Sequence, residues 1–289
     1  MHHPIKIPAF QKTILDWFGK NGRHELPWRQ TTNPYRILVS EIMLQQTQVD
    51  RVREKYTEFL KHFATHRKLA KASPADLLRV WKGLGYNRRA LFLQKAAQKI
   101  TKDFKGHFPD TVEGMETLSG VGPYTARAVS VFAYNNPEVF IETNIRRVFL
   151  HFFFPDKEKI SDVELFPFIK KALYKKNPRL WYSALMDYGA LALSDIPNPN
   201  KRSKHYVKQS RFEGSRRYAR AKILDFLLKN KTASLPQLQE FFQTDIHLDA
   251  YIESPVLLSI LADLAKEGFL EKKSPRWTLT RSSPLAPRS

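Results

Sequence analysis

The sequence predicts a mainly α-helical protein in which a long helical region, residues 1–195, precedes a small C-terminal module. Two of its helical segments begin with a cap residue followed by proline, Ser73-Pro74 and Asn177-Pro178, which is typical of a helix start. The periodicity stops near Asp195, where a polar stretch with prolines predicts a loop. Apolar residues recur at helical spacing in the segments 10–19, 34–48, 49–63, 74–82, 88–103, 111–117, 123–134, 142–151, 161–175 and 179–193.

The C-terminal part has a different pattern. An amphipathic basic helix is predicted over 216–230, shorter helices over 234–242 and 254–264, and two short strands around a basic turn within 268–279. Three helices and a hairpin are typical of a winged helix, which commonly presents its third helix to DNA or to a protein. The alternative is a small domain that only packs on the first one. We predict a winged-helix-like domain over 215–289, preceded by a basic loop over 196–214.

Net charge narrows the choice of partner. The 289 residues include 48 Lys and Arg against 28 Asp and Glu, so the net charge is +20 and the isoelectric point is near 10.0. This surplus favours a polyanion, whose phosphates the cations would neutralise. An anionic membrane surface is the weaker alternative, because no stretch has the roughly 18 apolar residues that span a bilayer. We therefore expect a nucleic-acid partner and no membrane association.

The terminus and the cysteine count indicate the compartment. The N-terminus lacks a signal-peptide pattern. The chain contains no cysteine, which excludes disulfides, thiolate zinc sites and cysteine-held iron–sulfur clusters. We expect a cytoplasmic, nucleoid-associated protein of bacterial type.

One motif points directly to DNA. The stretch Leu118-Ser-Gly-Val-Gly-Pro-Tyr-Thr-Ala126 places Gly120 and Gly122 between two predicted helices. Glycine permits positive φ, so backbone amides there can converge on a phosphate at the N-terminus of the second helix. A carboxylate, Glu142, follows shortly downstream and suggests chemistry on the bound DNA.

Five motifs occur in order along the chain. They are Leu26-Pro-Trp-Arg29, Ser40-Glu-Ile-Met-Leu-Gln-Gln-Thr-Gln-Val49, Gly83-Leu-Gly-Tyr86, Gly120-Val-Gly122 and Glu142-Thr-Asn144. With these motifs the chain resembles the helix-hairpin-helix (HhH-GPD) DNA glycosylases from about residue 10 to about residue 195, and among them the MutY-type adenine glycosylases most. The resemblance implies a two-lobed helical fold over 1–195, with the loop 196–214 in place of the family's four-cysteine iron–sulfur loop.

The resemblance assigns four catalytic positions. Glu41 matches the general acid that protonates N7 of adenine, and its apolar neighbours predict a raised pKa. Glu142 stands where the family has an aspartate that stabilises the cationic sugar, and Asn144 matches the residue that orients this carboxylate. Tyr124 occupies the position at which strand-cleaving relatives carry a Schiff-base lysine. A phenol cannot form a Schiff base, so we expect base release without strand cleavage.

Other matched positions concern the DNA and the base. Trp28 and Arg29 match residues that line the base pocket, whereas Ser183 replaces a glutamate or glutamine that reads adenine. Gln46 and Tyr86 match residues that push into the base stack beside the flipped nucleotide. The expected DNA contacts are Gln45, Gln46, Thr47, Tyr86, Gly120, Gly122, Arg88, Arg89, Arg127, Arg146, Arg147, Lys201, Arg202 and Lys204. Backbone carbonyls of Glu116, Leu118 and Val121 stand where family hairpins often hold a monovalent cation, Na⁺ or K⁺.

Several departures keep the target base open. Asn87 replaces a second tyrosine after Tyr86, and nothing resembles the strand-rich C-terminal domain with which MutY-type enzymes recognise 8-oxoguanine. The leading function is a monofunctional glycosylase for adenine opposite guanine or 8-oxoguanine. Alternatives are a glycosylase for uracil or thymine mismatches or for alkylated or crosslinked bases, and a non-catalytic protein that binds damaged DNA. We expect a monomer that binds duplex DNA with a mismatched or damaged base and requires no cofactor.

Overall fold

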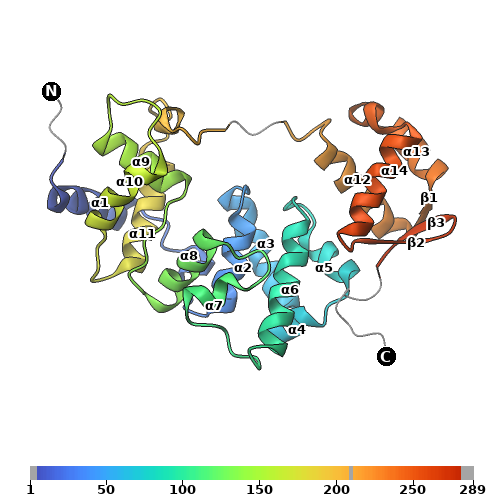
Figure 1. Cartoon of the computed structure of the whole chain (residues 1–289), viewed down its shortest axis with the longest axis horizontal. Helices are drawn as coiled ribbons and strands as arrows, with labels where there is room; N and C mark the ends of the chain where they lie inside the picture. The colour runs from blue at the N-terminus through green and yellow to red at the C-terminus, as the bar shows by residue number, and fades with distance from the viewer. Residues whose placement is uncertain (1–4, 208–210, 281–289) are drawn as a thin grey trace. The chain divides into compact units, whose positions relative to one another are not determined.

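The computed structural model of the chain describes residues 5–207 and 211–280. Its contacts divide into two compact units, and each unit combines segments that are distant in sequence. The first is formed by Met1–Ile42 with Phe108–Lys208, and the second by Met43–His107 with Gln209–Ser289. The domain boundaries predicted at residues 195 and 215 remain a proposal. Figure 1 labels the helices and strands.

The first unit is helical. Its α8 follows the glycine hairpin, and its α11 runs into a π-helical turn at Tyr188–Ala192. The helices are α1 (Ile7–Asn21), most of α2 (Pro34–Leu44), α7 (Val112–Glu116), α8 (Pro123–Tyr134), α9 (Thr143–Phe153), α10 (Asp162–Ala172) and α11 (Pro178–Asp187), with 3₁₀ turns at Pro27–Arg29 and Pro199–Arg202.

Aromatic side chains form much of the core of this unit. Phe10 of α1 packs edge-on against Phe149 of α9, at 5.4 Å between ring centroids, and against Trp181 of α11 at 5.7 Å. Phe140 stacks on Tyr182 at 4.0 Å. All five side chains are buried. Because large buried rings restrict the relative movement of the helices that carry them, α9 and α11 provide a rigid base for the polar residues at their ends.

The second unit begins with four helices, α3 (Val49–His62), α4 (His66–Ala70), α5 (Pro74–Trp81) and α6 (Arg88–Lys102). Helix α4 packs against α6, where the buried Gln94 amide donates to the carbonyls of Leu69 and Ala72 at 3.3 and 2.7 Å. Ser73 caps α5 by accepting the Asp76 amide, as the Ser73-Pro74 pair predicts. The ring of Trp81, at the end of α5, packs against Phe59 of α3.

The C-terminal segment of the second unit combines helices with a small sheet (Figure 1). It contains α12 (Arg216–Asn230), β1 (Thr232–Ser234), α13 (Leu235–Gln243), α14 (Ser254–Lys266), β2 (Leu270–Lys273) and β3 (Arg276–Leu279). The predicted hairpin pairs β2 with β3, and β1 adds a third antiparallel strand in the order β1-β3-β2. This succession of three helices and three strands is that of a winged helix.

The predicted fold class is confirmed, and the differences are local. The predicted helix 34–48 ends at Leu44, because Gln46 adopts a left-handed backbone with φ of 56°. The prediction missed α4 and β1, which are only five and three residues long. Within the described residues 5–207 and 211–280, no helix is both long and apolar enough to cross a membrane.

Candidate active site

Glu41 is a buried acid in the interior of α2. Only 6% of its surface is exposed, and its helix neighbours Leu38 and Ile42 are also buried. Burial raises the pKa of Glu41 from its ordinary value of 4.5 to about 7, the charge of Glu142 acts in the same direction, and a hydrogen bond from Tyr124 opposes both. A carboxyl group with a pKa near 7 is substantially protonated at neutral pH, so Glu41 can act as a general acid.

Tyr124 holds this acid in place. Its phenol donates a hydrogen bond to Oε2 of Glu41 at 3.1 Å, and its ring packs edge-on against the buried Phe140. Burial, together with the nearby carboxylates of Glu41 and Glu142, raises the pKa of Tyr124 far above its ordinary value. The phenol therefore remains protonated and keeps donating to Glu41, and the position offers no amine to a substrate.

Glu142 caps helix α9. Its Oε1 accepts the backbone amide of Ile145 at 2.7 Å, and its Oε2 accepts the side-chain amide of Asn144 at 3.3 Å. Burial raises the pKa of Glu142 above its ordinary value of 4.5, although the hydrogen bonds from Asn144 and Ile145 and the charge of Arg146 oppose this. Helix caps are usually shorter side chains. The extra methylene, relative to aspartate, is accommodated because the side chain folds back onto its own helix.

The glycine hairpin is anchored by its apolar residues. Leu118 and Val121 are buried, and the Val121 amide donates to the Leu118 carbonyl at 3.1 Å. Gly120 has φ of 78°, and a Cβ added at Gly122 would meet no atom within 4 Å. The N-terminus of α8 therefore has open space beside it, as phosphate binding requires. The cation predicted at the carbonyls of Glu116, Leu118 and Val121 remains a prediction.

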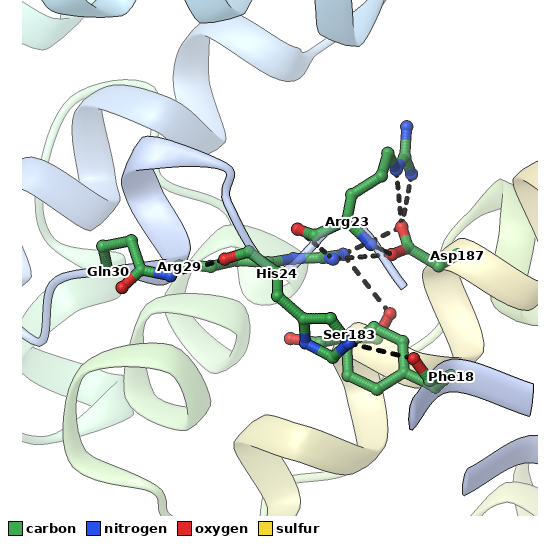
Figure 2. Close-up of polar contacts among 7 residues, drawn as sticks. All are labelled: Phe18, Arg23, His24, Arg29, Gln30, Ser183 and Asp187. Carbon is green, nitrogen blue, oxygen red and sulfur yellow. Dashed lines mark hydrogen bonds and ion pairs between the residues drawn. The ribbon is translucent and has the colours of Figure 1, made fainter. Parts of the chain in front are cut away.

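An ion-pair cluster fixes the segment that carries the predicted base-pocket residues. Asp187, at the end of α11, is fully buried and accepts two hydrogen bonds from Arg29, at 2.6 and 2.9 Å, and others from Arg23 (Figure 2). Burial alone would raise the pKa of Asp187, but these arginines outweigh it and hold the pKa below its ordinary value. The Arg29 guanidinium also donates to the carbonyls of Arg23 and Ser183. Arg29 is thus oriented from several sides.

Trp28 and Ser183 lie close to this cluster in the chain, and both are buried. Ser183 precedes Asp187 by one helical turn on α11, so one helix carries both the predicted base-contacting position and the acid that holds Arg29. Figure 2 shows the Arg29 guanidinium between Asp187 and the Ser183 carbonyl.

The π-helical turn after α11 packs directly on the start of α9. A Cβ added at Gly189 would lie 2.3 Å from the carbonyl oxygen of Asn144, so only glycine fits this close backbone approach. Arg147 of α9 donates to the Gly189 carbonyl at 2.8 Å. This contact fixes the residues beside Glu142.

The predicted DNA-wedge residues lie in two loops of the second unit. Gln46 is exposed, and Gln45, Thr47 and Tyr86 are partly exposed. The Thr47 hydroxyl lies 3.4 Å from the Leu84 carbonyl, which links the two loops. Arg89, expected to contact phosphate, is instead only 7% exposed and points into the protein. Arg88, beside it, is exposed.

The other arginines predicted to contact phosphate already bond to groups of the protein. Arg127 pairs with Glu116 at 3.1 Å, and Arg146 makes two hydrogen bonds to Asp162 at 2.7 and 2.8 Å. Arg147 is partly buried at the Gly189 carbonyl. The phosphate contacts predicted for these arginines remain untested.

The loop after α11 is fastened to α9, although it has no cysteine to hold an iron–sulfur cluster. Arg202 donates to the carbonyls of Leu150 and Phe154, near the end of α9, and Asn200 donates to Thr143 at its start. Lys201 and Lys204 are exposed. In the described part of the loop, Arg202 therefore has a packing role, and the two lysines face solvent.

The sequence interpretation missed three features of the site: the buried acid Asp187, its partner Arg23 and the close approach at Gly189. A sequence signal existed for the first, because Asp187 interrupts an apolar helical segment, Trp181-Tyr-Ser-Ala-Leu-Met. A buried acid requires a cationic partner, which Arg29 could have supplied. No cluster of His, Asp and Glu residues suited to a metal occurs among the described residues.

Comparison with known families gives this geometry a context. Residues 39–166 match the family described as the HhH-GPD superfamily of base excision DNA repair proteins. The matched segment includes Glu41, Tyr124 and Glu142, so the family match and these three residues concern the same part of the chain.

Individual relatives are similar over part of the chain. The adenine DNA glycosylase of Mycobacterium tuberculosis (strain CDC 1551 / Oshkosh) is 45% identical over 136 residues, which are 47% of this chain and 44% of that protein. The adenine DNA glycosylase of Buchnera aphidicola subsp. Baizongia pistaciae is 35% identical over 184 residues, 63% of this chain and 52% of that one. The chain thus spans about half the length of these relatives.

A solved structure has a similar fold over much of the chain. The structure of a thermostable thymine-DNA glycosylase superposes with a TM-score of 0.58 and 25% identity, over 68% of this chain and 92% of that one. The chain is thus similar in sequence to proteins named for adenine and similar in fold to a protein named for thymine.

Proposed function

We propose that the chain is a monofunctional DNA glycosylase of base excision repair that releases a flipped base from duplex DNA. The observation that carries the proposal is the buried Glu41, with a pKa near 7, hydrogen-bonded to Tyr124 and within electrostatic reach of Glu142. A protonated acid and an anionic carboxylate in one site match the needs of N-glycosidic bond cleavage, in which a poor leaving group departs from a cationic sugar.

The chemistry divides between the two carboxyl groups. Protonated Glu41 donates its proton to the ring nitrogen of the departing base, and the bond between that base and C1′ breaks. Ionised Glu142 stabilises the positive charge on the sugar while water adds to C1′ and loses a proton to the Glu41 carboxylate. Asn144 holds Glu142 during this step through its 3.3 Å hydrogen bond. Electrostatic stabilisation of this kind is often the largest contribution to the rate.

Tyr124 determines whether the DNA strand is cut after the base is released. Strand cleavage requires an amine that forms a Schiff base with C1′, and here a phenol hydrogen-bonded to Glu41 stands at that position. The proposed product is therefore an abasic site in an intact strand.

Adenine opposite guanine or 8-oxoguanine is the proposed substrate. The similarity to proteins named adenine DNA glycosylase supports it. Uracil or thymine opposite guanine is the second candidate, favoured by the likeness to the thymine-DNA glycosylase structure and by Ser183, which has a shorter side chain than a base-reading glutamate. We also propose that the protein acts as a monomer and requires no cofactor.

Single-turnover base release tests the proposal. Duplexes with adenine opposite guanine or 8-oxoguanine, and with uracil or thymine opposite guanine, are incubated with the protein and then heated in alkali. Wild type should give alkali-dependent cleavage of an adenine duplex, and Glu41→Gln should lower the rate at least about 100-fold. Glu113→Gln removes an exposed carboxylate of α7 and is the matched control.

Two results would refute parts of this proposal. If wild type and Glu41→Gln both bind but are equally inactive on every duplex, the proposed release of adenine, uracil or thymine is wrong. Cleavage without alkali, or trapping by borohydride, would contradict the role given to Tyr124.

A further inference from the structure

Two loops of the second unit contain residues in an unfavourable backbone conformation. Gln46 has φ of 56° and Tyr86 has φ of 46°, so both lie in the left-handed region. Side chains with a Cβ rarely adopt this region. Gly83 and Gly85, in the second loop, have positive φ without such a penalty. Gln46 and Tyr86 therefore need contacts from elsewhere in the protein to hold them as they are.

Arg89, in the first turn of α6, makes such contacts with both loops. In the first loop, its Nη1 donates to the carbonyls of Met43, at 2.9 Å, and Gln45, and its Nη2 donates to the Thr47 hydroxyl at 3.1 Å. In the second loop, Nη2 donates to the carbonyls of Leu84 and Gly85, both at 3.0 Å, and Nε donates to Tyr86 at 3.4 Å.

Three of these carbonyls belong to peptide bonds next to a strained residue. The Gln45 carbonyl is in the peptide bond before Gln46, and the carbonyls of Gly85 and Tyr86 are in the bonds on either side of Tyr86. The Arg89 guanidinium also lies 5.5 Å from the ring centroid of Tyr86 and 5.5 Å from that of Trp81. One buried guanidinium thus fixes both loops relative to each other and orients the Tyr86 ring.

Arginine suits this role better than lysine. A guanidinium has five N–H donors in a rigid plane, whereas an ammonium has three and no plane that can stack on rings. Burial lowers the pKa of Arg89 to about 10, so the group still carries its charge at neutral pH. A charge held away from water needs many acceptors, and the carbonyls of the two loops supply them.

We propose that Arg89 is a positioning residue that holds Gln46 and Tyr86 ready to enter the base stack of DNA. This inference rests on the proposed glycosylase function, because it gives the two loops their task. Arg89 is buried and its guanidinium bonds to the two loops, so it acts on DNA through the loops.

Hydrogen exchange of the free protein tests, without DNA, whether Arg89 fixes the two loops. Arg89→Lys keeps the positive charge but loses the planar guanidinium with its five donors. The amides of residues 44–48 and 83–87 should therefore exchange roughly 10-fold faster, while exchange in α3 and α4 remains unchanged. Arg79→Lys is the matched control, because Arg79 is an exposed arginine of α5 that pairs with Asp76. It should leave both loops at wild-type exchange.

Fluorescence tests the consequence for DNA. A duplex with 2-aminopurine at the target position, opposite guanine, is bound in the Glu41→Gln background so that no base is released. The fluorescence of 2-aminopurine rises when the base unstacks, so it reports the equilibrium constant for base flipping. Adding Arg89→Lys should lower this constant roughly 10-fold and reduce the fluorescence rise accordingly. The affinity for undamaged duplex should change less than about threefold. Adding Arg79→Lys should leave the signal as it is.

The outcomes are distinct. Wild-type exchange in both loops of a folded Arg89→Lys protein would overturn the proposal, as would undiminished fluorescence. If Arg89→Lys does not fold, Thr47→Val decides, because the Thr47 hydroxyl accepts from Arg89 at 3.1 Å and its other contacts, to the Gln45 and Leu84 carbonyls, are longer at 3.4 Å. Faster exchange of both loops supports the proposal and unchanged exchange overturns it. If the parent protein unstacks no base, the glycosylase function fails, while the exchange experiment still tests whether Arg89 holds the loops.

Discussion

The buried Glu41 should make folding stability depend on pH, and Glu41→Gln should remove that dependence. The carboxyl has its ordinary pKa of 4.5 in the unfolded chain and a pKa of about 7 in the folded protein. The folded state therefore binds the proton more tightly than the unfolded state does. The resulting stability is complete below pH 4.5 and is lost as the pH rises through about 7.

The size of the effect follows from the two pKa values. Each pKa unit corresponds to about 1.36 kcal/mol, so the loss between pH 4.5 and pH 8 is roughly 3 kcal/mol. Glu41 is only 6% exposed, so water screens little of this effect. Glutamine has nearly the same shape, its oxygen can accept the Tyr124 hydrogen bond, and it does not ionise. The stability of Glu41→Gln relative to wild type should therefore rise by roughly 2–3 kcal/mol over this range.

Urea unfolding at pH 5, 6, 7 and 8 measures this difference. The informative quantity is the free energy of unfolding of Glu41→Gln minus that of wild type, followed as a function of pH. Other titrating groups contribute equally to both proteins and cancel in this difference. Glu113→Gln, which removes an exposed charge, should follow wild type within about 0.5 kcal/mol at every pH. If Glu41→Gln and wild type remain parallel from pH 5 to pH 8, Glu41 is ionised in the folded protein, and it cannot serve as the acid.

Three further predictions concern the surroundings of the site. Asp187→Asn should lower the free energy of unfolding by about 3–5 kcal/mol in urea melts, because it leaves two arginine charges without their buried partner. Gly189→Ala should destabilise by about 1–3 kcal/mol and slow single-turnover base release, since its Cβ would meet the Asn144 carbonyl. Replacing Lys201 and Lys204 together by glutamine should reduce the salt dependence of DNA binding, by a log–log slope of up to about 1.8, without lowering the melting temperature. An unchanged slope would remove these lysines from the DNA interface.

Much of the helical architecture could be predicted because its signals are local. Ser73 and Asn177 cap α5 and α11, and Pro74 and Pro178 are the first residues of these helices, as helix-start chemistry predicts. The hairpin at Gly120 also has a local cause, the positive φ that glycine adopts easily. In contrast, the end of α2 depends on Gln46, whose left-handed conformation is held by Arg89, a residue more than forty positions away. No window of sequence around Gln46 contains that information.

In the candidate site, too, the residues with a local sequence signal could be predicted and the contacts between distant residues could not. The sequence identified Glu41, Tyr124 and Glu142 as candidates, and the structure places them within interacting distance. It could not indicate how Glu142 accommodates its extra methylene, because that depends on the side chain folding back to cap α9. The acid that interrupts the apolar segment of α11 indicated the need for a cationic partner, but the sequence could not indicate which arginine supplies it, since Asp187 and Arg29 are separated by most of the first unit's chain.

The net charge of the chain overstates how many basic residues can contact DNA phosphates directly. The net charge of +20 favours a polyanionic partner, but several arginines use their donors on the protein's own carbonyl groups. Arg89 holds two loops, Arg202 binds the end of α9, Arg147 binds Gly189, and Arg179 binds the carbonyls of Arg29 and Thr31. Carbonyl acceptors do not cancel charge, so these arginines add to the long-range field that attracts DNA. Donors that are already used on carbonyls are not free to bind phosphate, so the count of released ions should be well below the count of basic residues.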